Sequence, residues 1–226
     1  MLMTLKAVQV TEQCPVVALS VDFTRRDKDF AAAADGEGLK ENCVAYRIAA
    51  PVVKGIGQKE PLYLSMPMTK DKETLAASHR QAAARIGECL RQGKSVAWLT
   101  LGDTTIYASS LYAAELVKEE GYKVELISGV PSFCAAAARL GEPLVSGSQQ
   151  LHILPSSYRI EESLACSGTK VLMKAGSRLS KVKKILIEQG LEVKGVQRCG
   201  MKGEKVYGSA VELDEEAGYY TLLIVK

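Results

Sequence analysis

The sequence has few of the residues on which several common functions depend. It holds two histidines, His79 and His152, which lie far apart, so we predict no zinc site. Its six cysteines include no CxxC pair, which indicates reduced core cysteines of a cytoplasmic protein and not a disulfide framework. The GxGxxG, Walker, GxSxG and HExxH motifs are absent, and neither histidine has a spacing to Ser132 that indicates a catalytic triad.

Strong charge and long apolar runs are also missing. The net charge of +3 is too small to indicate nucleic-acid binding, and no basic stripe is interleaved with aromatic residues. No apolar run reaches the length of a transmembrane helix, and the start MLMTLKAVQV has no signal-peptide pattern. We therefore expect a globular protein whose partners include neither nucleic acid nor a membrane.

The most informative stretch covers residues 95–107, SVAWLTLGDTTIY. Its apolar run predicts a buried parallel strand that ends at Gly102 and Asp103. Asp103, Thr104 and Thr105 are expected to cap a helix over residues 106–121. Ligands of open α/β folds bind beyond the carboxyl ends of strands, so this corner is a candidate binding site. The alternative is a strand-to-helix corner with a purely structural role.

Hydrophobic periodicity predicts an α/β protein, and its pattern changes after a helix stop at Gly141 and Pro143. We divide the chain into two domains, residues 1–130 and residues 131–226. In the first, strands over residues 15–21, 62–66 and 122–128 join the central strand, with helices over residues 4–12, 41–50, 68–93 and 106–121. This alternation indicates a parallel sheet. We expect Thr69 to cap the helix over residues 68–93, and His79 on that helix to be a packing or surface residue.

The second domain is expected to hold a mixed, hairpin-rich sheet. Its strands are predicted over residues 150–154, 170–174, 191–199, 204–213 and 219–225, and its helices over residues 133–140, 159–165 and 179–189. Corners at strand ends recur at residues 101–107, 128–133, 173–177 and 208–210. Such corners offer backbone groups to a small polar ligand, which spacing alone does not identify.

Four strings carry a resemblance to a known family: LTLGDTTIYASS, ELISGVPSFCAAAARLG, MPMTKDKETL and YYTLLIVK. Together they resemble the tetrapyrrole methylases over nearly the whole chain, with a weaker match between residues 22 and 59. MPMTKDKE and PSFCAAAA are similar to the branch that acts on precorrin-2 or cobalt-factor II. The resemblance implies a homodimer of two-domain α/β chains, with S-adenosylmethionine in the cleft between domains and no protein-bound metal.

The implied reaction is methyl transfer to the C-20 bridging carbon of the corrin precursor, in cobalamin biosynthesis. The alternatives are a tetrapyrrole methylase that acts at a different carbon and a non-catalytic remnant that binds S-adenosylmethionine. The cofactor contacts implied by matching motifs are Leu101, Gly102, Asp103, Ile106, Pro131, Ser132, Met173, Lys174, Gly208, Ser209 and Ala210. The cations considered for the substrate carboxylates are Lys174, Arg178, Arg198 and Lys202. Tyr107 and Glu204 are candidates for a general base, with a structural role as the alternative for each.

Two features depart from the family pattern. Thr104 stands where the family has proline after Gly-Asp, and threonine is compatible with a cap. Family members also begin with a strand and a GxGPGDP loop, which would precede the MLMTLKA start of this chain. We expect a truncated or mis-started reading, with the loss of a central strand as the alternative. The DNA upstream of Met1 tests this expectation.

Overall fold

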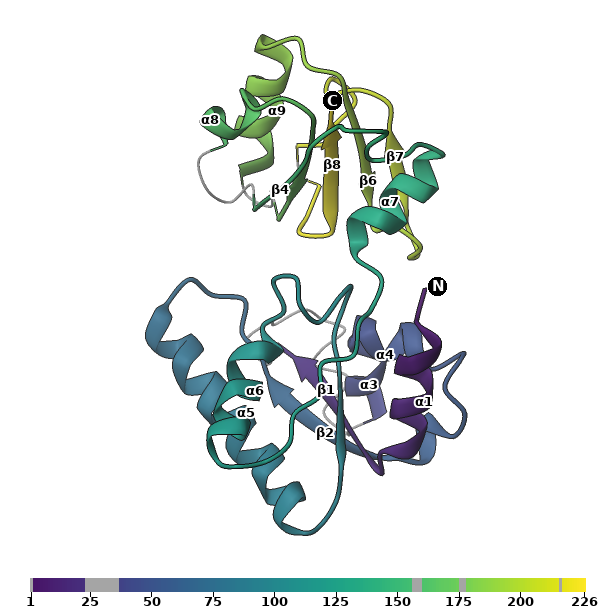
Figure 1. Cartoon of the computed structure of the whole chain (residues 1–226), viewed down its shortest axis with the longest axis vertical. Coiled ribbons are helices and arrows are strands. Elements are labelled where there is room, and N and C mark those ends of the chain that lie inside the picture. Colours follow the sequence, from purple (N-terminus) through teal and green to yellow (C-terminus); the bar gives the residue numbers. More distant parts are fainter. Residues whose placement is uncertain (1, 23–36, 156–159, 175–177, 216) are drawn as a thin grey trace. The chain divides into compact units, whose positions relative to one another are not determined.

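The computed structural model describes residues 2–22, 37–155, 160–174, 178–215 and 217–226. Its contacts divide the chain into two compact units, Met1–Val130 and Pro131–Lys226 (Figure 1). The sequence also predicts a loop, or a loop with a marginal helix, over residues 22–42, and residues 23–36 of it lie outside the described residues. Within the described part, no helix is long and apolar enough to cross a membrane.

The first unit is built on a three-stranded parallel sheet. Its strands are β1 (Val16–Val21), β2 (Glu60–Ser65) and β3 (Val96–Leu99), in the order β2-β1-β3. The middle strand β1 is apolar except for Ser20 and is buried along nearly its whole length, because helices cover both faces of the sheet. The prediction of a parallel first sheet is confirmed.

Helices pack against this sheet through alternate strand residues. Val16 and Ala18 of β1 face a cluster that includes Ile86 of α5 (Lys72–Arg91) and Ala113 of α6 (Ser110–Glu119). Val17 and Leu19 of β1 face α4 (Val44–Ala49), with which they share a second cluster. The other helices described in this unit are α1 (Leu5–Gln13), α3 (Glu37–Asn42) and the 3-10 turn η1 (Ile56–Gln58).

The start of helix α5 and the pairing of residues 122–128 differ from what the sequence predicts. Helix α5 begins after Asp71 and not at Thr69, because the Asp71 carboxylate accepts a 2.7 Å hydrogen bond from the Thr74 amide. Residues 122–128 are extended but join no strand ladder of the described part, although Tyr122 and Val124 pack on the core. The alternation of apolar residues correctly predicts that this segment packs on the core. It does not predict a strand, because a strand also needs backbone hydrogen bonds to a neighbour.

The second unit contains a five-stranded mixed sheet in the order β4-β5-β8-β6-β7. The strands are β4 (Leu151–Pro155), β5 (Thr169–Met173), β6 (Val193–Gln197), β7 (Lys205–Tyr207) and β8 (Thr221–Val225). Strands β4 and β5 are parallel, and the other pairs are antiparallel. The expected mixed sheet is confirmed, but of the three last strands only β6 and β7 form a hairpin, because β8 inserts between β5 and β6.

The helices described in the second unit are α7 (Ser132–Leu140), α8 (Glu161–Leu164) and α9 (Leu179–Glu188). Helices α8 and α9 enclose a core with Leu172 and Leu223, whereas α7 contacts β6 and β8. Strand β7 is shorter than expected, because the Glu212 carboxylate accepts hydrogen bonds from the Gly208 amide and the Ser209 hydroxyl and turns the chain.

All six cysteines are free, but they are not all core residues. Cys14, Cys43 and Cys89 are buried, as expected. Cys134 and Cys166 are exposed and Cys199 is half-buried, because each lies on the outer side of a helix or in a turn.

Candidate functional site

The corner after β3 is held together by one buried carboxylate. Asp103 accepts hydrogen bonds from the amide and hydroxyl of Thr105, at 2.8 and 2.5 Å. Its second oxygen accepts from the Ser128 hydroxyl and the Gly129 amide, each at 2.8 Å. The carboxylate therefore ties the loop after β3 to the loop that follows the extended segment of residues 122–128.

These four donors stabilise the charged form of Asp103. Hydrogen bonds, above all those from Thr105, hold the pKa of the Asp103 carboxyl well below its usual range, although burial opposes the shift. None of the four donors carries a charge, and Asp103 is 6% exposed. The carboxylate consequently acts as an internal anchor and not as an open ligand for cations.

The two loops also touch through their backbones. A Cβ atom built on Gly129 would lie 2.0 Å from the carbonyl oxygen of Gly102, a separation that no side chain allows. Gly102 itself has a positive φ of 73°, which glycine adopts without strain. Thr4 adds a third segment, since its hydroxyl donates to the carbonyl of Ser128 at 2.9 Å. Glycine at position 129 is thus required by close approach and not by its own φ.

The helix after this corner begins later than expected. Helix α6 starts at Ser110, and the side chains of Asp103, Thr104 and Thr105 do not cap it. The Asp103 oxygens are occupied by the loop donors, and the Thr104 hydroxyl donates instead to the carbonyl of Ile127 at 3.1 Å. Tyr107 has a φ of 52°, which is incompatible with a helical turn at that position.

The other predicted cofactor residues of this corner and of α7 differ in exposure. Leu101 is 39% exposed and Ile106 is half-buried, so both present apolar surface at the end of β3. Ser132 is the first residue of α7. Pro131 is at the N-cap position, and its side chain makes no capping hydrogen bond. The predicted cofactor role of these residues stays a prediction.

In the second unit, some candidates share one end of the sheet. Met173 ends β5, and the strand register brings the end of β6, followed by Arg198, to the same end. Lys174 and Arg198 are thus separated by two strand spacings, about 10 Å. Gly208 lies at the other end, because β7 runs back along β6 and Tyr207 pairs with Gly195. The structure therefore does not bring Gly208, Ser209 and Ala210 to the end that carries Met173 and Lys174.

Backbone strain marks three of the candidates. Tyr107, Lys174 and Arg198 have φ values of 52°, 59° and 52°, and they are the non-glycine residues of the described part with positive φ. Such conformations cost about 1–3 kcal/mol each and are concentrated at functional sites. Lys174 is also half-buried, and burial lowers the pKa of its ammonium group.

Glu204 is an anchor of the β6–β7 loop. Its carboxylate accepts a 2.5 Å hydrogen bond from Nε of Arg139 on α7 and a 2.6 Å hydrogen bond from the Gly200 amide. These bonds lower the pKa of the Glu204 carboxyl. The loop it holds contains Arg198 and Lys202, both of which are exposed, as is Arg178 before α9. Arg139 is not among the predicted residues, since nothing in its local sequence signals a partner 65 positions away.

His79 serves packing. Its ring stacks on Tyr112 of α6, with centroids 4.8 Å apart and planes 11° from parallel. Burial lowers the pKa of the His79 imidazole, which favours the neutral, stacked form. The prediction of a packing or surface histidine is confirmed.

These observations define a two-unit α/β protein with polar loops beyond the carboxyl ends of its strands. Residues 1–214 match the model of the family described as Tetrapyrrole (Corrin/Porphyrin) Methylases. The chain therefore belongs to the tetrapyrrole methylase family.

Two curated relatives match nearly the whole chain. A probable cobalt-precorrin-2 C(20)-methyltransferase of Methanocaldococcus jannaschii is 32% identical over 228 residues, which cover 100% of this chain and 90% of the relative. A precorrin-2 C(20)-methyltransferase of Sinorhizobium sp is 28% identical over 230 residues, which cover 99% and 89%.

Solved structures share the fold. A cobalt precorrin-4 methyltransferase superposes with a TM-score of 0.64 at 18% identity, over 98% of this chain and 87% of that one. A uroporphyrin-III C-methyltransferase from Thermus thermophilus, solved with S-adenosyl homocysteine, has a TM-score of 0.62 at 18% identity, over 98% and 90%. At these identities the likeness establishes the fold alone.

Proposed function

We propose that this chain transfers a methyl group from S-adenosylmethionine to C-20 of precorrin-2 or of its cobalt form, in cobalamin biosynthesis. The observation that carries the proposal is the likeness to the Methanocaldococcus jannaschii C(20)-methyltransferase, which extends over the full chain. The Sinorhizobium relative has the same regiospecificity in its name. Methylation at a different carbon, and a remnant that binds the cofactor without turnover, are the less favoured alternatives.

The corner after β3 is chemically suited to the proposed cofactor. Its fixed charge, the Asp103 carboxylate, is satisfied by internal donors. What remains is neutral backbone together with the apolar surface of Leu101 and Ile106, which matches a ligand with apolar and polar parts. We propose that Leu101, Gly102, Asp103 and Ile106 form the cofactor shelf, chiefly through their backbone. Contacts from Pro131, Ser132, Met173, Lys174, Gly208, Ser209 and Ala210 stay predictions.

The reaction places modest demands on the side chains. S-adenosylmethionine would supply an activated methyl group, which an enamine-like ring carbon would attack in line as the bond to sulfur breaks and S-adenosylhomocysteine leaves. The protein then acts mainly by proximity and orientation. Lys174, Arg178, Arg198 and Lys202 are the proposed partners of the substrate carboxylates. Glu204 is a poor candidate for a general base, because its carboxylate is held by Arg139 and Gly200. Tyr107 stays the candidate with an exposed side chain.

We propose further that the enzyme is a homodimer of the cytoplasm. The family resemblance supports the dimer, and the free cysteines are compatible with a reducing compartment. Sedimentation of the purified chain at several concentrations tests the dimer, for which a mass near 49 kDa is expected, about twice the chain's 24.4 kDa.

The proposal is tested with ¹³C-methyl S-adenosylmethionine and precorrin-2, or its cobalt form, under anaerobic conditions. A ¹³C signal from a methyl group attached to C-20, with one S-adenosylhomocysteine released per methyl, is the expected result. Label at a different ring carbon would establish the first alternative. Calorimetric binding of S-adenosylhomocysteine without any turnover would establish the second.

A further inference from the structure

We propose that Thr4 and Thr104 are positioning residues of the corner after β3, because their hydroxyl groups hold the loop of residues 127–129 against it. Both threonines and this loop belong to the first unit, Met1–Val130. The inference rests on the proposed function, since it concerns the corner that we propose as the shelf for S-adenosylmethionine. It adds two residues that act on that shelf from outside it.

The loop of residues 127–129 is not held by a strand ladder. Residues 122–128 join no ladder within the described residues, so the backbone bonds that fix a strand beside its neighbour do not fix this segment. Apolar packing anchors its beginning, where Tyr122 and Val124 contact the core. Nearer the corner, Leu126 is 50% exposed and Ser128 is exposed as well. The position of the loop therefore depends on its polar contacts.

Two threonine hydroxyls bind successive carbonyl groups of the loop. The Thr104 hydroxyl donates to the Ile127 carbonyl at 3.1 Å, and the Thr4 hydroxyl donates to the Ser128 carbonyl at 2.9 Å. The two donors come from separate parts of the chain, because Thr104 belongs to the corner itself and Thr4 is the N-cap residue of α1. The loop is thus tied both to the corner and to the first turn of a helix.

The position of this loop determines the contacts of Asp103. The Ser128 hydroxyl and the Gly129 amide each donate to the Asp103 carboxylate at 2.8 Å. A shift of the loop by about 1 Å would stretch these bonds beyond hydrogen-bond distance. Gly129 also lies against the Gly102 carbonyl, so the same shift would disturb the proposed cofactor shelf. The two threonines therefore act on the shelf through the loop.

Thr4 has a second role, which the test must separate from the first. Its hydroxyl oxygen accepts a 3.3 Å hydrogen bond from the Ala7 amide and so caps α1, while its proton is donated to Ser128. Serine keeps both bonds. Aspartate is a good N-cap residue, but its ionised carboxylate has no proton to donate. Thr4→Asp therefore keeps the cap and removes the bond to the loop.

Binding of S-adenosylhomocysteine is measured by calorimetry at pH 7. We expect the Kd to rise about fivefold in Thr104→Val and in Thr4→Asp, which is the effect of one lost neutral hydrogen bond. Thr4→Ser should restore the Kd of the wild type. Thr11→Val is the matched control and should leave the Kd unchanged, because the Thr11 hydroxyl also donates to a backbone carbonyl, that of Ala7 at 2.7 Å, but within α1.

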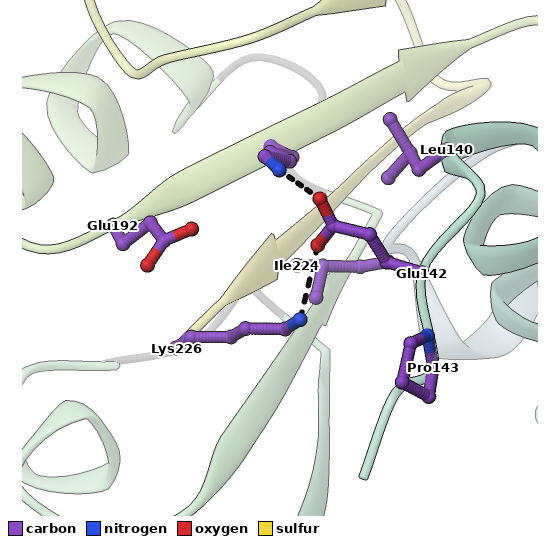
Figure 2. A pocket seen from close by; sticks show the side chains of 7 residues that line it. Leu140, Glu142, Pro143, Glu192, Ile224 and Lys226 are labelled. Carbon is purple, nitrogen blue, oxygen red and sulfur yellow. Dashed lines mark hydrogen bonds and ion pairs between the residues drawn. The ribbon is translucent and has the colours of Figure 1, made fainter.

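Hydrogen exchange of the Gly129 amide gives a readout that needs no cofactor. This amide is bound by Asp103, and we expect it to exchange about fivefold faster in Thr104→Val and Thr4→Asp, while the amides of β1 keep their rates. Glu142→Gln in the second unit weakens the ion pairs of Glu142 with Lys194 and Lys226 (Figure 2). It is the control for a general loss of stability and should not change the exchange of Gly129.

The outcomes separate this proposal from the proposed function. If the wild-type protein did not bind S-adenosylhomocysteine, the proposed function would fail, and the role of the threonines at a cofactor shelf would fail with it. Binding by the wild type with the same Kd in Thr104→Val and Thr4→Asp would overturn the positioning role alone. Faster exchange throughout β1 as well as at Gly129 would also overturn it, because the threonines would then contribute only general stability.

Discussion

The two units hold their loops at strand ends in different ways. In the first unit, a single buried carboxylate, Asp103, is surrounded by neutral donors from two loops. In the second, Glu204 and Glu142 hold loops and strand ends through partly exposed ion pairs with Arg139, Lys194 and Lys226. Screening by solvent makes such exposed ion pairs weak. Removal of a buried carboxylate costs more folding free energy, because its buried donors are then left without an acceptor.

The difference indicates which loop geometry is rigid. The corner after β3 is fixed by hydrogen bonds and by backbone contact between Gly102 and Gly129, so its shape is set before any ligand arrives. The β6–β7 loop depends on Glu204 and on the strained Arg198, whose φ is 52°. We infer a preformed shelf in the first unit and a more adjustable cationic loop in the second.

The largest effect is expected from Gly129→Ala. The new Cβ would lie 2.0 Å from the carbonyl oxygen of Gly102, so the two loops must separate and the hydrogen bonds to Asp103 must break. We expect a loss of about 3 kcal/mol in the free energy of unfolding, in the range of buried backbone and polar disruptions. Urea denaturation followed by circular dichroism measures it.

Gly121→Ala is the matched control for that substitution. Gly121 has a φ of 89°, but a Cβ atom added there would meet no described atom within 4 Å, so only backbone strain opposes alanine. A cost of about 1–2 kcal/mol is expected there. If Gly129→Ala were no more destabilising than Gly121→Ala, the contact between the loops would not be a rigid element.

The sequence predicts the positions of several strands, but it does not predict which distant loops are joined by hydrogen bonds. Apolar runs locate β1, β3, β5 and β8, because a strand that is buried on both faces consists of consecutive apolar residues. The prediction of Asp103 as a helix cap is wrong, since its partners Ser128 and Gly129 are 25 and 26 positions away. Local patterns predict local bonds, and they cannot reveal which distant loop shares a carboxylate.

A smaller effect, about 2 kcal/mol, is expected from Asp103→Asn. The amide keeps the shape of the side chain. Its NH₂ group, however, would face backbone donors that in the wild-type protein bind a carboxylate oxygen. Because the pKa of the Asp103 carboxyl is lowered in the folded protein, its contribution is complete above the unfolded pKa of about 3.9 and declines as the pH falls below it.

The measurement for Asp103→Asn is the unfolding free energy of both proteins between pH 3 and pH 7. The gap between wild type and variant should be constant near neutral pH and narrow as the pH falls below about 4. A gap that did not narrow would show that the carboxylate charge is not what fixes the corner.

The smallest effect on stability, about 0.5 kcal/mol, is expected from Glu204→Gln, because its pair with Arg139 is partly exposed. The functional readout separates two roles. If Glu204 positions the loop of Arg198 and Lys202, the KM for the tetrapyrrole should rise several-fold with kcat nearly unchanged. Glu161→Gln, which removes an ion pair with Lys181, is the control and should change neither constant. A hundredfold fall in kcat at unchanged KM would instead indicate that Glu204 is a catalytic base. The second unit would then contribute to proton transfer as well as to binding of the substrate carboxylates.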